Sequence, residues 1–308
     1  MRDAFVKKLN ELANEDESIF FITADLGFGV FDEFSKNFPN QYLNVGVAEQ
    51  NMTGIATGLA LEGRKVFTYS IANFATLRCL EQIRNDAAYH EVNLTIVASG
   101  GGFTYGALGM SHHATEDISI MRSIPNLQVV SPCTAWETYH ATNALSKTKG
   151  VSYLRIEKGG IQSPPNKNAT FEIGKAIEMQ SGKDITIIGT GGIIIDCLKA
   201  ADLLKNNGLS AQVISMHSIK PLDEACIKEC AINNKNIITV EEHNKIGGLG
   251  SAVSEIIAQH NLGCNLKIIA LEDTFSSVVG SQEFLRDYYK LDSKTIFQEA
   301  LKLIENVK

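Results

Sequence analysis

The stretch Leu94-Thr-Ile-Val-Ala98 consists almost entirely of apolar and β-branched residues, so neither face of a strand built from it suits water. A strand of this kind belongs in a sheet that helices cover on both sides. Other short runs of the same character occur in the first half of the chain, at 19–23, 66–69, 127–130 and 151–155. We therefore expect these segments to form one buried, mainly parallel sheet.

Segments with helical spacing lie between these runs. Residues 49–61 place apolar side chains at helical intervals, and residues 77–89 and 134–145 also predict helices. Thr134 and Glu137 have the spacing of a capping box, which satisfies the free N–H groups at a helix start. Strands that alternate with helices indicate a doubly wound α/β sheet.

A second unit of the same class follows residues 157–170, a stretch rich in Gly, Pro and Asn that we interpret as a linker. Its expected strands are 185–188, 211–215, 237–240 and 266–270, and its expected helices lie near 193–206, 223–232 and 249–259. The sequence thus predicts two doubly wound, mainly parallel α/β domains, 1–156 and 171–308.

Composition excludes several classes of function. The 308 residues carry a net charge of −7, which argues against nucleic acid as the main partner. The chain has no uninterrupted apolar run of the ~20 residues that a membrane helix needs, and its first residues are too charged for a secretory signal. We expect a cytoplasmic protein whose six cysteines, none in a Cys-x-x-Cys pair, are reduced thiols.

Several polar residues stand where strands are expected to end. Glu49 opens a predicted helix, either because the helix dipole favours an acid there or because its side chain enters a pocket. His112 and His113 follow a Gly-rich loop and suit proton transfer, or they lie before a helix capped by Ser111 or Thr115. Phe74 belongs either to the hydrophobic core or to a functional site. For 247–250, Gly-Gly-Leu-Gly, we favour a tight turn over an anion-binding loop.

Three of these segments together resemble a known family. Val45-Gly-Val-Ala-Glu49-Gln-Asn, Phe74 with Arg78 and Glu81-Gln82-Ile-Arg84, and Gly109-Met-Ser-His112 occur in the order and at the separations found in the C-terminal half of transketolases. They also resemble the related 1-deoxyxylulose-5-phosphate synthases. The likeness runs from about residue 3 to residue 300, and 241–248 resembles part of the transketolase C-terminal domain.

The resemblance implies a role for each matching residue. Glu49 falls on the carboxylate that hydrogen-bonds N1′ of the aminopyrimidine of thiamine diphosphate and so assists removal of the cofactor's C2 proton. Phe74 matches the ring that stacks on the aminopyrimidine, and Arg78 and Asp25 are further cofactor contacts. His112 matches a catalytic histidine that contacts substrate oxygen, with His113 beside it, and Arg155 resembles the arginine that holds a substrate phosphate.

The resemblance also has gaps. Leu108 stands where the family usually has an acid that contacts sugar hydroxyls, and 24–29 lacks a serine that helps to hold phosphate, so the substrate stays open. The chain contains no Gly-Asp-Gly, the motif through which these enzymes bind the diphosphate and Mg²⁺. The resemblance therefore implies a separate subunit that carries this motif, the cofactor bridging the two chains, and an α₂β₂ heterotetramer.

The expected activity is transfer of a two-carbon ketol unit from a ketose or ketose phosphate to an aldose. One alternative is the β-subunit of a 2-oxo acid dehydrogenase E1 component, which shares the fold and the glutamate, or an enzyme like 1-deoxyxylulose-5-phosphate synthase. Another is a binding subunit that kept the fold without the activity, since a fold does not by itself imply a reaction.

Overall fold

In the computed structural model, residues 1–157, 161 and 169–305 are described. The first part of the chain forms α1 (Arg2–Glu15), β1 (Ile19–Thr23), α2 (Asp32–Asn37), η1 (Pro39–Gln41), β2 (Tyr42–Asn44), α3 (Glu49–Leu61), β3 (Lys65–Ile71), α4 (Ala72–Thr76), α5 (Leu80–Gln82), η2 (Ile83–Ala88), β4 (Leu94–Ser99), η3 (Gly106–Leu108), α6 (Asp117–Ser123), β5 (Leu127–Val130), α7 (Ala135–Leu145) and β6 (Val151–Ile156).

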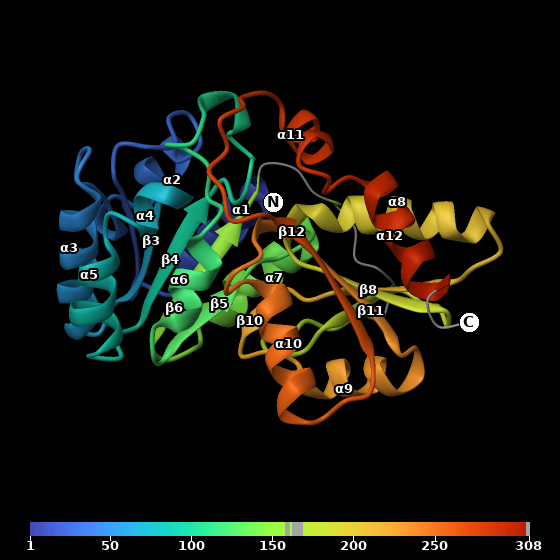
Figure 1. Ribbon diagram of the computed structural model, residues 1–308. Coiled ribbons are helices and arrows are strands. Elements are labelled where there is room, and N and C mark those ends of the chain that lie inside the picture. Colours follow the sequence, from blue (N-terminus) through green and yellow to red (C-terminus); the bar gives the residue numbers. More distant parts are fainter. Residues whose placement is uncertain (158–160, 162–168, 306–308) are drawn as a thin grey trace.

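The second part forms β7 (Ile177–Gln180), β8 (Ile185–Gly189), η4 (Gly191–Ile193), α8 (Ile194–Asn206), β9 (Ala211–Ser215), β10 (Ser218–Lys220), α9 (Glu224–Asn233), β11 (Asn236–Asn244), α10 (Leu249–Gln259), β12 (Asn265–Leu271), α11 (Gln282–Tyr288) and α12 (Ser293–Glu305). The elements up to β6 and those from β7 onward make two units that lie side by side (Figure 1). Most of the segment that we interpret as a linker, 157–170, lies outside the described residues.

Each unit is built on its own sheet. Within the described residues the first sheet has the order β10-β5-β6-β4-β3-β1-β2, and the second has the order β12-β11-β8-β9-β7. In these two sheets, all pairings are parallel except β10 with β5 and β7 with β9. The predicted fold class, two doubly wound and mainly parallel α/β domains, is confirmed.

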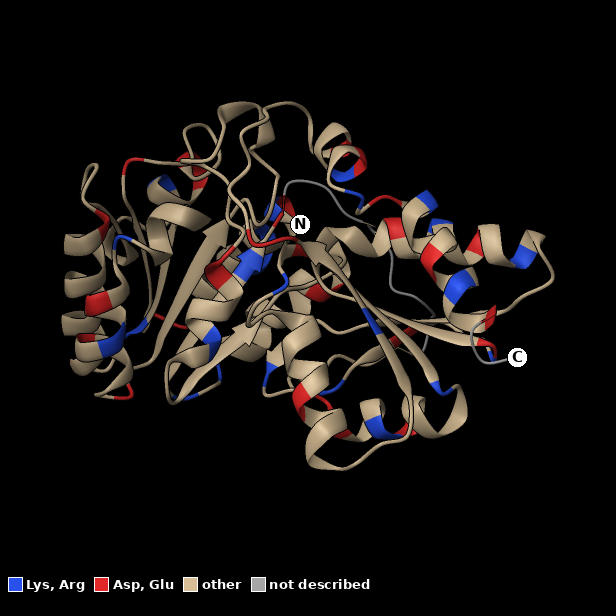
Figure 2. Cartoon of the chain, viewed as in Figure 1, with Lys and Arg blue, Asp and Glu red and all other residues tan. Residues whose placement is uncertain are grey.

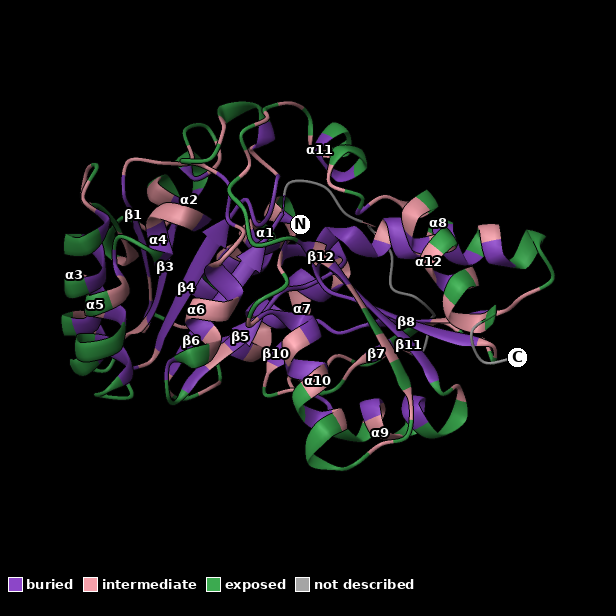
Figure 3. Ribbon diagram, in the orientation of Figure 1, coloured by how far each residue is buried: buried purple, intermediate pink, exposed green. Residues whose placement is uncertain are grey.

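Alternate side chains of the first sheet enter two different cores, as the two-residue period of a strand requires. Phe21, Phe67 and Val97 pack with α1 and α7 on one face, whereas Ile22 and Val66 face α3 and its neighbours on the other. Figure 3 shows the central strands of the first sheet, such as β3 and β4, buried and the outer faces of the helices exposed. The apolar runs are buried on both sides because helices cover both faces.

The two units share a core and one strand. The core beneath α3 continues into the second unit through Ile188, Ile214 and Ile237. In addition, β10 leaves the second part of the chain and pairs with β5 at the edge of the first sheet, with Ser218 opposite Val130. The contacts between the units therefore include backbone hydrogen bonds as well as packed side chains.

Most elements expected from the sequence are present. Every predicted strand occurs, although β11 continues to Asn244, beyond its expected end, and α3 and α10 begin and end as predicted. Thr134 caps α7 with the expected capping box. The helix predicted over 77–89 is shorter and less regular than expected: it begins only at Leu80, after Cys79 departs from the helical conformation (φ −103°, ψ 6°), and α5 passes directly into η2, a stretch of π-helix.

The distribution of charge and the lengths of the helices can be compared with what the composition suggests about nucleic acid and membranes. Basic and acidic residues are interspersed over both units (Figure 2). None of the helices in the described parts of the chain is long and apolar enough to span a membrane.

Buried His217 makes the stability of the fold depend on acid. Its ring stacks on Phe171 with centroids 4.4 Å apart, and burial lowers the pKa of His217 from 6.5 to about 4. Between these values the unfolded chain binds a proton that the folded chain does not, so the free energy of unfolding falls as the pH falls.

We expect His217→Gln to weaken this dependence, because an amide stays neutral throughout the range. The histidine should lower the free energy of unfolding by about 3 kcal/mol between pH 7 and pH 4. Urea unfolding at several pH values would show this as a steeper pH dependence of the free energy of unfolding in the wild type than in the variant. Parallel pH curves for the wild type and the variant would contradict this assignment.

Candidate functional site

The predicted site residues gather at one edge of the first sheet. Strands β1, β2, β3 and β4 are neighbours and parallel, so their carboxyl ends lie together. Asp25 follows β1, Glu49 follows β2, Phe74 and Arg78 follow β3, and His112 and His113 follow β4. Ligand sites in open α/β sheets lie at this edge, where the loops are free to carry polar side chains.

Glu49 is the first residue of α3 and is only 1% exposed. One carboxylate oxygen accepts a hydrogen bond from Arg78 Nη1 at 2.6 Å, and the other accepts one from Ser70 Oγ at 3.3 Å. The helix N-terminus and the guanidinium both stabilise a negative charge at this point. Glu49 begins a helix, as the first interpretation of its sequence position has it, and its buried side chain contacts Ser70 and Arg78; its entry into a ligand pocket stays a prediction.

Phe74, Arg78 and His112 lie against one another beside Glu49. The Arg78 guanidinium carbon is 4.9 Å from the centre of the Phe74 ring, and the Phe74 and His112 rings are 5.1 Å apart, edge to face. Phe74 is only partly buried, so one part of its ring is available to a ligand. Asn73 Nδ2 donates to the Ser111 carbonyl at 2.8 Å and ties the histidine loop to the end of β3.

The two adjacent histidines have different surroundings. His112 is partly exposed, and its Nδ1 lies 3.0 Å from Ser111 Oγ. His113 is buried, burial lowers its pKa, and its Nε2 lies 3.2 Å from the Gly106 carbonyl. Since a carbonyl only accepts, that nitrogen carries the hydrogen. Of the two histidines, His112 is thus the one accessible to solvent, whereas His113 is buried and its ring contacts the main chain of the loop.

Asp25 lies in an adjoining loop in the left-handed backbone region, with φ 54°. Its N–H donates to Asn44 Oδ1 at 2.9 Å, and its carboxylate accepts from Asn44 Nδ2 at 3.2 Å. These bonds join the ends of β1 and β2. The structure therefore places Asp25 near the site but engaged with a neighbouring loop.

Arg155 is buried at the contact between the two units. It is 1% exposed, Nε donates to Asp117 at 2.8 Å, and Nη2 donates to the carbonyls of Ala114 and Glu242, each at 3.0 Å. Asp117 also accepts from Tyr153 at 2.6 Å. The expected contact with a substrate phosphate does not fit this geometry, because the guanidinium lies inside the protein, between the two units.

The glycine segment 247–250 forms a turn, as expected, with Gly247 at φ 77°. The free N–H groups at the start of α10 already have an anionic partner. Leu249 N and Gly250 N donate to the two carboxylate oxygens of Glu241, at 2.7 and 2.8 Å. An internal carboxylate thus occupies the place that a phosphate would take.

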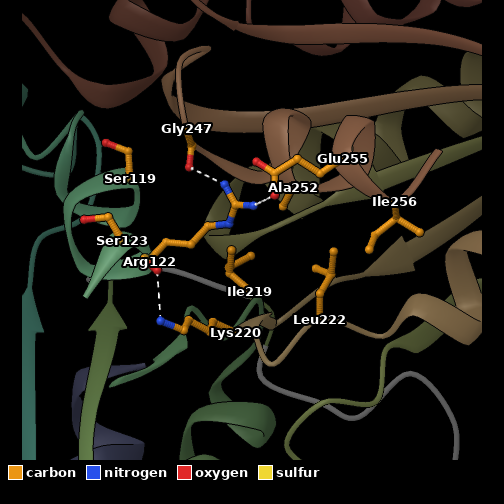
Figure 4. A pocket seen from close by; sticks show the side chains of 10 residues that line it. All are labelled: Ser119, Arg122, Ser123, Ile219, Lys220, Leu222, Gly247, Ala252, Glu255 and Ile256. Carbon is orange, nitrogen blue, oxygen red and sulfur yellow. Dashed lines mark hydrogen bonds and ion pairs between the residues drawn. The ribbon is translucent and has the colours of Figure 1, made fainter. Parts of the chain in front are cut away.

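A cavity of about 250 Å³ adjoins His113 and is lined mainly by apolar side chains, including Leu77, Met110 and Phe275. A larger hollow, about 500 Å³, lies elsewhere, between α6, β10 and α10 (Figure 4). Its cations are already paired: Arg122 donates to Glu255 and to the Gly247 carbonyl, and Lys220 donates to the carbonyls of Arg122 and Ile124. Of these places, we take the edge of the sheet around Glu49 as the candidate site.

Two residues of the site were not predicted. Ser70 is the second-last residue of β3 and contacts Glu49, and Asn73 holds the histidine loop. A small polar residue at the end of a buried strand, followed by an amide at a helix start, is a signal that could have identified both. That signal is weak, because such residues also cap helices and turns.

Fold and site together define a two-domain α/β protein with a buried carboxylate, an aromatic ring and a histidine at the carboxyl edge of its first sheet. The family descriptions that match are the transketolase pyrimidine-binding domain, over residues 1–163, and the transketolase C-terminal domain, over residues 174–296. The chain belongs to the transketolase family.

Similar proteins agree with this assignment. A transketolase C-terminal section from Methanocaldococcus jannaschii is 40% identical, over all of this chain and 96% of that protein. A subunit of an apulose-4-phosphate transketolase from Phocaeicola vulgatus is 35% identical, over 99% of this chain and 97% of that one. A 6-deoxy-6-sulfo-D-fructose transketolase subunit from a Clostridium species is 34% identical, over 99% and 94%.

Solved structures show the same fold. A split-gene transketolase, described as an inactive beta4 tetramer, superposes with a TM-score of 0.91 at 33% identity, over 99% of this chain and 98% of that one. By sequence, the chain is also similar to a 1-deoxy-D-xylulose-5-phosphate synthase from Halothermothrix orenii. The two are 34% identical over 98% of this chain and 48% of that protein. The predicted function as a transketolase subunit, and hence as part of a transferase, is confirmed at this level, and the family implies thiamine diphosphate.

The location of Arg155 makes a prediction. Removing one partner of a buried ion pair leaves the other charge uncompensated, so Arg155→Met should lower the free energy of unfolding by about 3–5 kcal/mol. Lys65→Met removes an ion pair with Asp16 in which both side chains are partly exposed, and it should cost no more than about 1 kcal/mol. Urea unfolding of the two variants compares them directly, and a mild effect of Arg155→Met would show that this arginine is not a structural ion.

Proposed function

We propose that this chain is the pyrimidine-side subunit of a split, thiamine-diphosphate-dependent transketolase. The observation that carries the proposal is the buried Glu49 carboxylate beside the accessible Phe74 ring and His112. A carboxylate next to an aromatic face suits the aminopyrimidine, which offers a basic ring nitrogen and a flat surface. When bound, thiamine diphosphate supplies the carbon nucleophile and electron sink for ketol transfer.

In this proposal Glu49 holds a proton at N1′ of the aminopyrimidine. Its enclosed position keeps water from competing for the carboxylate, which strengthens the hydrogen bond. Phe74 orients the ring by offset stacking, a contact worth about 1 kcal/mol beyond the area that it buries. Arg78 now covers Phe74 and pairs with Glu49, and since it is half-exposed its head group can shift toward solvent when the ring stacks.

His112 is assigned to the substrate. It projects from the loop after β4 beside Phe74 and is partly exposed, so it can donate to a substrate hydroxyl or carbonyl oxygen and carry a proton near neutral pH. His113 keeps the loop in place and does not meet the substrate directly. We assign Asp25 to the loops that border the cofactor site. Arg155 is buried and paired with Asp117, so it is not proposed as a phosphate ligand.

The substrates proposed are a ketose or ketose phosphate donor and an aldose acceptor. Relatives named for apulose 4-phosphate and for 6-deoxy-6-sulfo-D-fructose act on sugars with an anionic group. With Arg155 buried and Arg78 paired to Glu49, we assign the recognition of such a group mainly to the partner subunit.

The partner proposed is a subunit that carries Gly-Asp-Gly and binds the diphosphate and Mg²⁺, in an α₂β₂ assembly. Large apolar side chains project from the loops around the site: Phe28 is 78% exposed, Val47 is 76% exposed and Phe275 is 73% exposed. Exposed apolar side chains grouped at a functional edge are typical of a protein interface. The relative described as an inactive beta4 tetramer is consistent with a β-subunit that needs a second kind of chain.

Glu49→Gln tests the role of the carboxylate. An amide of the same shape cannot hold the proton at N1′, so we expect kcat of the assembled complex to fall at least about 100-fold. The free energy of unfolding should change by no more than about 1 kcal/mol, because the ion pair lost is partly exposed on the arginine side. Ketol transfer is measured by coupled detection of the product sugar.

Glu62→Gln is the matched control, an exposed glutamate at the far end of α3, the helix that Glu49 begins, and it should leave turnover unchanged. Retention of full activity in Glu49→Gln would remove the basis of the proposal.

The interface is tested by placing a charge on the exposed rim. Phe28→Asp and Phe275→Asp should each weaken assembly with the Gly-Asp-Gly subunit at least about tenfold, because apolar anchors dominate such interfaces. Ile232→Asp is the control, since Ile232 is 70% exposed on α9, away from the site. Affinity is measured by light scattering with thiamine diphosphate and Mg²⁺ present, and equal affinities for all three variants would place the interface elsewhere.

A further inference from the structure

Residues 100–116 connect β4 to α6 and form the loop that carries His112. The loop is closed at its base by two backbone hydrogen bonds between Gly102 and Ala114, of 2.9 and 3.0 Å. The His112 ring itself has few polar contacts, chiefly Ser111 Oγ. Its position therefore depends on what holds the loop as a whole.

The second unit makes three hydrogen bonds to the main chain of this loop. Phe103 N donates to Glu242 Oε1 at 2.8 Å, Asn244 N donates to the Thr115 carbonyl at 2.7 Å, and Gly280 N donates to the Gly106 carbonyl at 3.3 Å. Figure 1 shows the segment before α11 passing beside the loops at the top of the first sheet. Both ends and the middle of the loop are thus attached to the C-terminal unit.

The bond to Glu242 is the most buried of these. Both Phe103 and Glu242 are inaccessible to water, and the Phe103 ring lies between Tyr289 and His113, with centroids 5.4 and 5.0 Å away. The loop also approaches the carboxylate very closely. A Cβ on Gly102, which has φ 57°, would lie 2.7 Å from Glu242 Cδ, so only glycine fits there.

Glu242 is in turn fixed by Arg286 of α11. Arg286 Nη2 and Nε donate to Glu242 Oε2 at 2.7 and 3.2 Å, and Nη1 donates to Asp196 at 3.1 Å. Gln282 Nε2 adds a bond of 2.9 Å to Glu242. A charge-assisted, two-point contact of this kind fixes direction as well as distance.

We propose that Arg286 is a positioning residue for His112, acting through Glu242 and the Phe103 N–H on the loop that carries the histidine. This inference rests on the proposed function only for the role of His112; the mechanical link from α11 to the loop stands on the contacts alone. It gives the C-terminal unit a part in the reaction although the contacts of Glu49 found in the described part of the chain come from the first unit.

Electrostatics support the same link. Burial raises the pKa of the Glu242 carboxyl, and the Arg286 guanidinium opposes that effect. Without Arg286, Glu242 would lose its main cationic partner, and its side chain would no longer be held in one orientation. The Phe103 N–H would then face a carboxylate that is free to turn toward other donors.

The test uses amide hydrogen exchange of the full chain, followed by turnover of the assembled enzyme. Arg286→Met should speed exchange of the amides in 102–113 at least about tenfold while leaving those of α3 unchanged. In the complex, kcat should fall on the order of tenfold with unchanged affinity for thiamine diphosphate, because displacement of a catalytic group lowers rate without removing the cofactor's contacts. Arg286→Lys keeps the charge but cannot span Glu242 and Asp196 together, so it should give a smaller change of both kinds.

Arg122→Met is the matched control. Arg122 also links the units, through Glu255 and the Gly247 carbonyl, but at the other end of α6. It should lower stability without changing exchange in 102–113.

Arg286→Lys also serves if Arg286→Met fails to fold, since the lysine still neutralises the buried carboxylates. Wild-type exchange rates in the loop of the folded variants would overturn the link, whatever the activity. Fast loop exchange with an unchanged kcat in these variants would overturn the role of Arg286 in positioning His112. A wild-type complex that shows no ketol transfer would instead count against the proposed function.

Discussion

The buried guanidinium of Arg155 is the constraint on which the arrangement of the two units depends. A charge removed from water is costly unless each of its donors finds a partner. Asp117 and Glu157 of the first unit lie beside it, and it also donates to a carbonyl of the second unit, that of Glu242. The second sheet therefore has to lie where its Glu242 carbonyl reaches this guanidinium.

The neighbouring charges follow from that placement. Glu157 also accepts from Gly192 N and lies near Arg286, which in turn pairs with Glu242 and Asp196. Opposite charges alternate in this network, so Arg155, Arg286, Asp117, Glu242 and Asp196 each lie beside a charge of the other sign. The same network fixes the loop of His112 relative to α11, and the edge of the sheet where Glu49 lies is thereby held on two sides.

Much of this could be predicted from the sequence because it depends on neighbouring residues. Apolar runs determine the strands, and the spacing of Thr134 and Glu137 determines a helix start. Parallel order then brings Glu49, Phe74 and His112 together, although up to 63 positions separate them, because each follows a strand of the same sheet. The chemistry of these three residues could be inferred from their types once the family resemblance supplied the cofactor.

The remaining features could not be predicted, because they depend on residues distant in sequence. Arg155 looked like a phosphate ligand until the structure brought Asp117 and Glu242 to it from other elements. The break at Cys79 interrupts a segment whose apolar spacing is helical throughout. The stacking of Arg78 on Phe74 likewise depends on how that turn is made, and local propensity does not encode it.

The three-residue strand β10 has a consequence for how the chain can be made and divided. It lies at the edge of the first sheet, beside β5, yet it comes from beyond the linker. A ribosome that has released only the first 170 residues exposes an unprotected strand edge, which readily pairs with foreign strands. A gene break between the two sheets would leave this edge uncovered in the first fragment, so the first unit relies on the second to cover its sheet edge.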